Sequence, residues 1–565
     1  MGKKATALVL LIILAFSLCA CSAAPENGDN GQQSPSAPAL PPVTSRGIAV
    51  TFIDGPAGFD PALCAMDRIQ ISYMMNLFEG LYKYDQDGKV VFAMAEELSI
   101  SDDGKVLTFT IRSDARWSDG RAVTAADFVY AWRRAADPEL KAPYRSLLLP
   151  ILNASDVLEG RSEPDKLGIA AVDEKTLEVK LDEPEDSRNI QALFTYPIFA
   201  PLREDMKEGW AISPQALITN GPFHVAGISN HAMTYAASDT YYDFFDMINT
   251  QIEFKFYDGA EDAYQAFAAG DVLFSSDVPD AALSDYADFE QSPIVIQPQL
   301  GTYFIDFNNA RAPFNDRRVR QAFSLVIPRG DIAGNVMKGL ALPATGFVPN
   351  SVSDLEPGTN FRTTGGHLLS NAVAGDDEFT RNVTLAQKLL EDAGYEGGED
   401  FPAIEYLYNK DSAQQEAIAQ QLQLAWKEHL GVTVLLRALE AEAFLAARET
   451  GDYFIARDGV VTAADDPYDF LSLFLTGYCS NHANFFNKQY DNLLLQSVNT
   501  SSEAERLALL HQAEQILIGE AGVAPVYFYA TGYLLNPALS GVVTTPQGFF
   551  LLQHIQLDES KVQLS

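Results

Sequence analysis

The sequence is poor in the residues that build metal sites and disulfide frameworks. It has four cysteines and seven histidines in 565 residues, which excludes a scaffold held together mainly by disulfides or structural zinc. The histidines do not show the close spacing of metal ligands. None of the G-x-S-x-G, P-loop or H-E-x-x-H motifs is present. We therefore expect a protein that is not an enzyme and that carries no cofactor and no metal.

Positive charge is also scarce. The chain has 39 lysines and arginines against 76 aspartates and glutamates, which gives a formal net charge of -37. Such a surface repels nucleic-acid phosphates and anionic lipid headgroups. We expect no nucleic-acid partner, and no contact between the membrane and the body of the protein.

The chain begins with an apolar run that is too short to span a membrane. Lys3 and Lys4 precede "ATALVLLIILAFSLCA", whereas a spanning helix needs about 20 apolar residues. This pattern is typical of a secretory signal, which we place at residues 1–20. The following Leu18-Cys19-Ala20-Cys21 resembles the lipobox of bacterial lipoproteins, and the resemblance implies that Cys21 is acylated and becomes the mature N-terminus. The alternative is an ordinary cleaved signal.

Residues 21–46 form a predicted linker. They are rich in Pro, Ser, Gly and Ala and show no hydrophobic period, so they cannot contribute to a core. Beyond them only Cys64 and Cys479 remain as thiols. The two can pair or stay free, and the sequence does not decide between these states.

The first part of the body shows hairpin and helix signals. The stretch "SDDGKVLTFTIR" has Asp103-Gly104 as a turn, followed by strict alternation of apolar and polar residues, which predicts half-buried antiparallel sheet. The stretch "WSDGRAVTAADFVYAWRRAADP" predicts a helix that begins at Thr124, uses Asp127 as capping partner and ends at Pro138. Its Trp132 is expected in the core.

Farther along, helices and strands alternate. A helix is expected over "TLAQKLLEDAG", capped by Thr384 and closed by Gly394. A strand at "AIEYLYN", a long helix ending at Gly431 and a strand at "VTVLL" follow. This strand, helix, strand order predicts a parallel α/β lobe that differs from the hairpin-rich first part.

Several stretches stand out when they are taken in order. They are "GFDPALCAMD", "NLFEGLYKYDQDGKVVFAMAEELSISDDGKVLTFTIRSDARWSDGRAVTAADFVYAWRRAADP", "TNGPFHV", "TYFIDFNNARAPFNDRRVRQAFSLVI" and "LLEDAGYEGGEDFPAI". Together they resemble the signature blocks of the oligopeptide- and dipeptide-binding proteins of ABC importers. The resemblance extends from Phe59 to beyond Tyr490 and so covers nearly the whole mature chain.

The resemblance implies an α/β fold with two lobes that close on a ligand like a hinged clamp, as in periplasmic binding proteins, with an extra antiparallel subdomain in the first lobe. It places lobe I at residues 47–66, 200–300 and 526–565. The inserted subdomain then spans residues 67–199, and lobe II spans residues 301–525.

The stretch "RDGVVTAADDPYDF" at residues 457–470 corresponds to a family segment that usually runs R-x-G-W-x-A-D-Y-x-D-P. The resemblance implies that Arg457 faces a peptide carboxylate, and that the first family aspartate, which meets the peptide ammonium, is replaced by Ala463. Asp465 points to the same face of an extended segment, about 6.5 to 7 Å farther along, and is the predicted substitute.

The next residues predict a helix start rather than a ligand contact. Asp466 is a suitable N-cap, Pro467 suits the first helical position, and Asp469 favours the first turn. Arg457 has a structural alternative too, an ion pair with an acidic residue of its own lobe.

The stretch "GTYFIDF" at residues 301–307 is expected to form a strand near the ligand. An extended peptide could pair its backbone with this strand, which makes Thr302, Tyr303 and Phe304 candidate ligand contacts. Backbone pairing would give affinity that depends little on side chains.

The expected partners are a short peptide and the permease subunits of an ABC transporter, with the membrane reached only through the lipid anchor. The protein is expected to act as a monomer at the outer face of the cytoplasmic membrane. Two alternatives stay open: a lipoprotein receptor that senses peptides, and the same fold binding a metal chelate, haem or an oligosaccharide.

Overall fold

The computed structural model describes residues 47–65, 67–184, 187–247, 249–286, 291–356, 358–410, 412–462, 464–500 and 502–561. The expected signal, the linker with Cys21, and Ala463 lie outside these residues. Among the helices that are described, none is both long enough and apolar enough to cross a membrane. The described residues belong to one compact unit.

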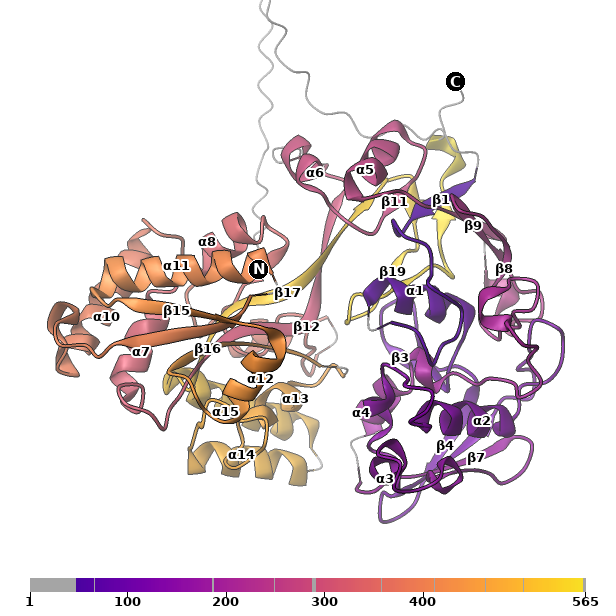
Figure 1. Ribbon diagram of the computed structural model, residues 1–565, viewed down its shortest axis with the longest axis horizontal. Coiled ribbons are helices and arrows are strands. Elements are labelled where there is room, and N and C mark those ends of the chain that lie inside the picture. Colours follow the sequence, from indigo (N-terminus) through magenta and orange to yellow (C-terminus); the bar gives the residue numbers. More distant parts are fainter. Residues whose placement is uncertain are drawn as a thin grey trace, which may run out of the picture. The chain divides into compact units, whose positions relative to one another are not determined.

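One large mixed sheet runs through this unit (Figure 1). Its strands in spatial order are β15 (Val434–Leu439), β14 (Ile404–Asn409), β16 (Ile455–Val461), β12 (Ile294–Phe307), β17 (Val523–Leu535), β11 (Phe274–Ser275), β1 (Ile48–Thr51), β10 (Gln251–Lys255), β9 (Ala232–Ala237) and β8 (Phe223–Ile228), with β13 (Ala341–Pro343) paired to β17.

The remaining strands form small antiparallel sheets. They are β4 (Ala95–Ile100), β5 (Val106–Ile111), β7 (Thr176–Lys180) and β6 (Ile169–Ala171) in one sheet, and the pairs β2 (Tyr82–Tyr84) with β3 (Val90–Phe92), β18 (Leu539–Ser540) with β21 (Gln556–Leu557), and β19 (Val543–Thr544) with β20 (Phe550–Leu551).

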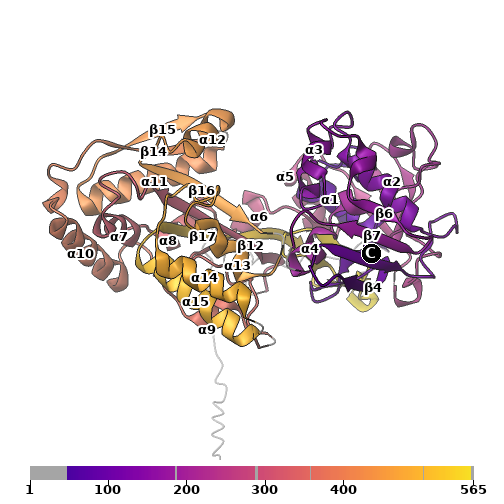
Figure 2. The same ribbon diagram turned by 90° about the horizontal axis from the view of Figure 1, so that it is seen from below.

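Helices cover these sheets. They are α1 (Arg68–Leu77), α2 (Ala125–Ala136), α3 (Ala154–Leu158), α4 (Ser187–Leu193), α5 (Ala260–Ala269), α6 (Asp280–Asp285), α7 (Arg317–Leu325), α8 (Arg329–Asp331), α9 (Phe361–Gly365), α10 (Asp377–Asp392), α11 (Ala413–Leu430), α12 (Ala441–Glu449), α13 (Pro467–Leu471), α14 (Lys488–Asn499) and α15 (Glu503–Gly519). Helices α14 and α15 lie side by side in both ribbon views (Figures 1 and 2).

The hairpin and helix predicted in the first part are confirmed. Strands β4 and β5 pair antiparallel, and the apolar positions of β5 are buried. Helix α2 begins after Thr124, whose capping box with Asp127 is present. Its Trp132 is fully buried and donates its indole N–H to the Phe199 carbonyl, 2.8 Å away. The capping residues and the apolar stripe thus specified this helix locally.

The predicted strand, helix, strand unit is confirmed as β14, α11 and β15, with the two strands parallel. The predicted start of the preceding helix at Thr384 is wrong, because α10 already begins after Asp376. Two acidic residues in its first turn favour the positive end of the helix dipole there. Thr384 lies inside the helix, and its hydroxyl donates to the Thr380 carbonyl.

Strands β12 and β17 are long and run antiparallel along each other. Near one end of this ribbon β17 pairs with β11, and near the other β12 pairs with β16. A register shift interrupts the ribbon between Pro298 and Thr302. A second register shift lies between Tyr303 and Phe304. The lobe boundary at residue 301 stays a prediction.

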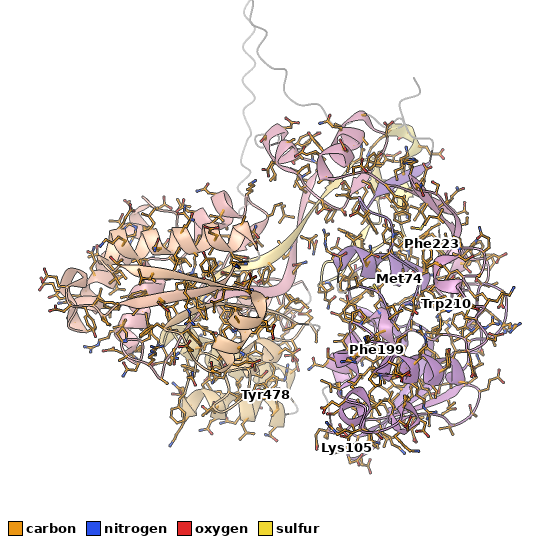
Figure 3. The ribbon with its side chains drawn as sticks, in the orientation of Figure 1. Met74, Lys105, Phe199, Trp210, Phe223 and Tyr478 are labelled. Atoms are coloured by element: carbon orange, nitrogen blue, oxygen red, sulfur yellow. The ribbon has the colours of Figure 1, made fainter. Side chains whose placement is uncertain are left out.

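Separate hydrophobic cores lie along the sheet. One contains Met74, Phe199 and Phe223, which Figure 3 labels. Another packs Tyr303 against β14 and α11 residues. Cys64 is buried in the first core, Cys479 is exposed, and both thiols are unpaired.

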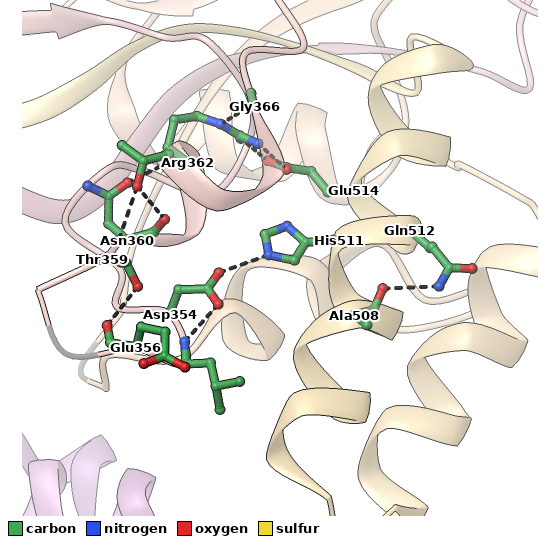
Figure 4. A network of polar contacts seen from close by, with 12 residues as sticks. Asp354, Glu356, Thr359, Asn360, Arg362, Gly366, Ala508, His511, Gln512 and Glu514 are labelled. Carbon is green, nitrogen blue, oxygen red and sulfur yellow. Dashed lines mark hydrogen bonds and ion pairs between the residues drawn. The ribbon is translucent and has the colours of Figure 1, made fainter. Parts of the chain in front are cut away.

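A buried ion pair ties the segment after β13 to α15 (Figure 4). The guanidinium of Arg362 donates to both carboxylate oxygens of Glu514 at 2.6 and 2.7 Å. Glu514 also accepts the backbone N–H groups of Phe347 and Val348. Because every polar group is paired, this charged cluster is accommodated in the core.

Candidate functional site

Within the described part of the chain, one edge of β16 lacks a neighbouring strand over half its length. Strand β12 pairs with β16 from Ile455 to Val461, whereas β14 pairs with it only at Ile455 and Ala456. The backbone N–H of Thr462 donates to Leu300 on the β12 side. Since alternate residues of a strand face the same neighbour, the backbone groups of Gly459 and Val461 face the open edge.

The backbone N–H of Gly459, the first donor of this edge, already has a hydrogen-bond acceptor. The Gly459 N–H donates to Oδ1 of Asp458 at 2.7 Å, and Oδ2 of Asp458 forms an ion pair with Arg448 of α12 at 2.8 Å. Among the residues that the structure describes, the Gly459 carbonyl and both backbone groups of Val461 have no partner at this edge. This is the arrangement that an added strand can use.

Arg457 lies at the start of the same open stretch and is half-buried. Its Nε donates to Oδ1 of Asn409 at 2.7 Å, and its guanidinium lies 5.2 Å from the centre of the Phe444 ring. No carboxylate from the described residues lies within the 4.0 Å of an ion pair. The structural alternative, an ion pair within the lobe, is therefore not formed among these residues.

The hydroxyl of Tyr529 lies within the electrostatic influence of the Arg457 guanidinium. Burial raises the pKa of the Tyr529 hydroxyl to about 12, although the positive charge of Arg457 acts in the opposite direction. The Tyr529 ring covers Gly301 and Gly459, where it leaves no room for a side chain. The absence of a side chain at these two glycines thus leaves the space that the Tyr529 side chain occupies.

Asp465 is exposed, and its carboxylate holds a neighbouring loop. It accepts the backbone N–H of Ser353 at 2.7 Å and the Ser353 hydroxyl at 2.6 Å. Its role as an ammonium anchor stays a prediction. The residue that it was expected to replace, Ala463, lies outside the described residues.

The helix start predicted after Asp465 is present. Asp466 caps α13 by accepting the Tyr468 N–H at 2.8 Å, and Pro467 occupies the first helical position. Arg506 of α15 donates to both carboxylate oxygens of Asp466, at 2.8 and 2.7 Å. The sequence could not indicate this partner, because it lies 40 positions away.

The expectation that a ligand pairs its backbone with "GTYFIDF" is wrong for residues 302–306, because β16 and β17 flank this part of β12 on both sides. The side chains of Thr302, Tyr303 and Phe304 are buried, and the Thr302 hydroxyl donates to Phe347. Contact between these residues and a ligand stays a prediction. Their observed contacts are with the protein interior.

Asp306 is a functional candidate that the sequence did not reveal. It is 1% exposed on β12, beside Asp458 and Arg448. Burial, together with the negative charge of Asp458, raises the pKa of the Asp306 carboxyl well above its ordinary value. Arg448 forms its ion pair with Asp458, whereas both carboxyl oxygens of Asp306 are buried without a hydrogen-bond partner among the described residues.

A cavity of about 240 Å³ adjoins Asp465. Its lining residues are Tyr84, Gly88, Lys89, Val90, Gln191, Ala192, Ala464, Asp465 and Pro546. The segment after Asp465 has a further contact with α4, because Asn189 donates to Asp469 at 3.1 Å. Residues 457–465 therefore supply backbone groups at a strand edge, a guanidinium, and a carboxylate that lines a cavity.

An open strand edge in an α/β protein is a place where an extended ligand can add a strand, as in proteins that bind peptides. A sequence model of the bacterial extracellular solute-binding proteins, family 5, matches residues 89–482. The chain is 31% identical over 559 residues to the dipeptide-binding protein DppE of Bacillus subtilis, and the match covers 98% of each protein. The chain therefore belongs to family 5 of the bacterial extracellular solute-binding proteins, as its sequence blocks predicted.

Two other relatives widen the comparison. The probable deoxycholate-binding periplasmic protein YgiS of Escherichia coli is 32% identical over 476 residues, which is 83% of this chain and 85% of the relative. The unliganded open form of the murein tripeptide-binding protein MppA superimposes with a TM-score of 0.78 at 29% identity, covering 91% of this chain and 98% of the other. These similarities confirm the predicted α/β binding-protein fold.

Proposed function

We propose that the protein captures short peptides for an ABC importer, and that the peptide adds a strand to the open edge of β16. The observation that supports this most is the unpaired edge at Gly459 and Val461 beside an arginine that has no acidic partner among the described residues. The names of DppE and MppA, which bind a dipeptide and a murein tripeptide, agree with this proposal.

Backbone pairing suits a transport protein that accepts varied peptides. A ligand N–H would donate to the Gly459 carbonyl, and a ligand carbonyl would accept the Val461 N–H. These groups are common to all peptides, so the affinity depends little on side chains. Arg457 would then bind a ligand carboxylate through its guanidinium, a charge-assisted interaction that also fixes the direction of the peptide.

A further part of the proposal concerns the location of the protein. Cys21 would carry the lipid anchor that keeps the protein at the outer face of the membrane, near the permease subunits, where it acts as a monomer. Several acyl chains anchor durably, whereas one anchors weakly. Growth with labelled palmitate tests this part: the wild-type protein takes up label and Cys21→Ala does not, whereas equal labelling would refute the anchor.

Closure about the β12 and β17 ribbon would enclose the ligand. Register shifts between Pro298 and Thr302 and between Tyr303 and Phe304 make this ribbon irregular, and the open form named for MppA supports an open and a closed state.

Small-angle scattering tests the proposed uptake and closure together. A pool of random tripeptides is added in excess, and the free protein serves as the reference. We expect a smaller radius of gyration with the pool. Saturating ligand with an unchanged radius would refute the closure.

A second candidate ligand is an apolar solute with a carboxylate. It is favoured by the similarity to YgiS, which is named as a probable deoxycholate-binding protein, and by the aromatic rings beside Arg457. Competition separates the two candidates, because deoxycholate would displace bound tripeptides only if it shares the site.

A further inference from the structure

The charged side chains of residues 457–469 differ in their burial and in the partners that they already have. Asp458 and Asp466 are each paired with an arginine, Arg448 and Arg506, at 2.8 and 2.7 Å. Both carboxylates are buried. A ligand ammonium could reach them only by displacing an arginine from a desolvated pair, which is costly because it leaves a buried charge unpaired.

The other two carboxylates of this stretch are accessible but already bonded. Asp465 is exposed and accepts two hydrogen bonds from Ser353. Asp469 accepts a hydrogen bond from Asn189. An ammonium that approaches Asp465 would form an exposed ion pair, and such pairs contribute little, because water and salt screen the attraction.

Arg457 differs from all four carboxylates. It is half-buried, its Nε is held by Asn409, and the face of the Phe444 ring lies 5.2 Å from its guanidinium. Its remaining N–H groups have no carboxylate partner among the described residues. A carboxylate that binds to Arg457 would form a charge-assisted interaction with its guanidinium. This interaction is favoured because the guanidinium is partly shielded from water and already held in position.

We propose that this site recognises the carboxylate end of its ligand and largely ignores the amino end, so that its ligands include peptides whose amino group is acylated. This inference rests on the proposed function, since it concerns the ligand at the same edge of β16. It names the ligand class: an extended, carboxylate-bearing, amide-containing molecule for which a free ammonium is not required.

Competitive affinity selection provides the test. The protein is incubated with equal amounts of random tripeptides in three forms: free, N-acetylated, and N-acetylated with a C-terminal amide. Bound species are identified by mass spectrometry after rapid desalting. One enriched sequence is then measured in all three forms by calorimetry.

We expect N-acetylation to change the affinity by less than about fivefold, because an exposed ion pair contributes no more binding free energy than that factor represents. Amidation of the carboxylate should weaken binding by about tenfold or more, because it removes the binding free energy of a charge-assisted hydrogen bond. Loss of binding on acetylation that exceeds the loss on amidation would overturn the inference and leave peptide binding intact. If none of the three pools binds, the proposed function fails, and the inference fails with it.

Variants separate recognition from a general structural effect. In Arg457→Gln, acid and amide forms should bind equally, because the group that distinguishes them is gone, whereas Arg457→Lys should restore part of the difference. Arg437→Gln is the matched control, since Arg437 already pairs with Asp452. An acid preference that persists in Arg457→Gln would assign carboxylate recognition to another residue and overturn the proposal.

Discussion

At the scale of single residues, buried charged side chains from distant segments meet around the large sheet. Asp306, Asp458 and Arg448 come from β12, β16 and α12, and only the folded sheet brings them together. Asp466 and Pro467 predicted the start of a helix, because helix capping depends on residues that are adjacent in the sequence. Its partner Arg506 and the Asp306 cluster could not be predicted, since neither has a signal within a short window of sequence.

Replacing Asp306 should change how stability depends on pH. Its folded pKa is raised by burial and by Asp458, so the folded state holds this proton more tightly than the unfolded state. The wild-type protein therefore loses stability as pH rises from about 3.9, the ordinary value of an unfolded aspartate, toward the higher folded pKa. Asp306→Asn removes this loss.

The expected result is a variant that gains stability relative to wild type between acidic and neutral pH, measured by urea denaturation at several pH values. Exposed Asp262→Asn serves as the control and should not change the slope in this way. A constant difference between Asp306→Asn and wild type at all pH values would contradict the raised pKa of Asp306.

The ion pair between Arg362 and Glu514 should be important for stability. Both side chains are nearly inaccessible, at 2% and 1% exposure. Arg362→Met leaves the Glu514 charge buried without its main partner, which costs about 3 to 5 kcal/mol of unfolding free energy. Lys388→Met, whose ion pairs lie at the surface, should cost less than about 1 kcal/mol. Denaturant titration of both variants checks this, and equal losses would refute it.

At the scale of elements, the sequence was informative wherever a pattern repeats along one segment. The alternation in β5, the capping box of α2 and the strand, helix, strand order of β14, α11 and β15 were all predicted and are present. What could not be predicted is which strand has a free edge. A free edge depends on pairing between distant segments. The observed pairing covers both edges of β12 at residues 302–306 and leaves part of β16 open, so the candidate ligand strand is β16 and not β12.

The open edge of β16 can be tested with one substitution. Val461→Pro removes the N–H that faces away from β12 and should preserve the pairing with β12, because proline is tolerated at strand edges. We expect peptide affinity to fall by about fivefold or more, the loss of one hydrogen bond together with steric obstruction. Thermal stability should change little.

Val461→Ala is the matched control, because it shortens the side chain and keeps the N–H. Calorimetry with the same tripeptide pool compares the two variants. If Val461→Ala weakens binding as much as Val461→Pro does, the side chain rather than the backbone edge contacts the ligand.

At the scale of the whole molecule, the family membership accounts for the fold, and the edge of β16 with Arg457 accounts for the proposed ligand. The lobe boundaries at residues 66, 200, 301 and 526 stay predictions. The large sheet passes through residues of both expected lobes by way of β12 and β17, so the fold alone does not separate them.

The most direct test of peptide capture is mass spectrometry of the ligand that the protein carries. The chain is purified under native conditions, offered the free and acetylated tripeptide pools, desalted and then denatured to release what is bound. The account predicts that short peptides with a free carboxylate are released in a stoichiometry near one per chain. Release of a non-peptide solute alone, with no uptake from either pool, would contradict it.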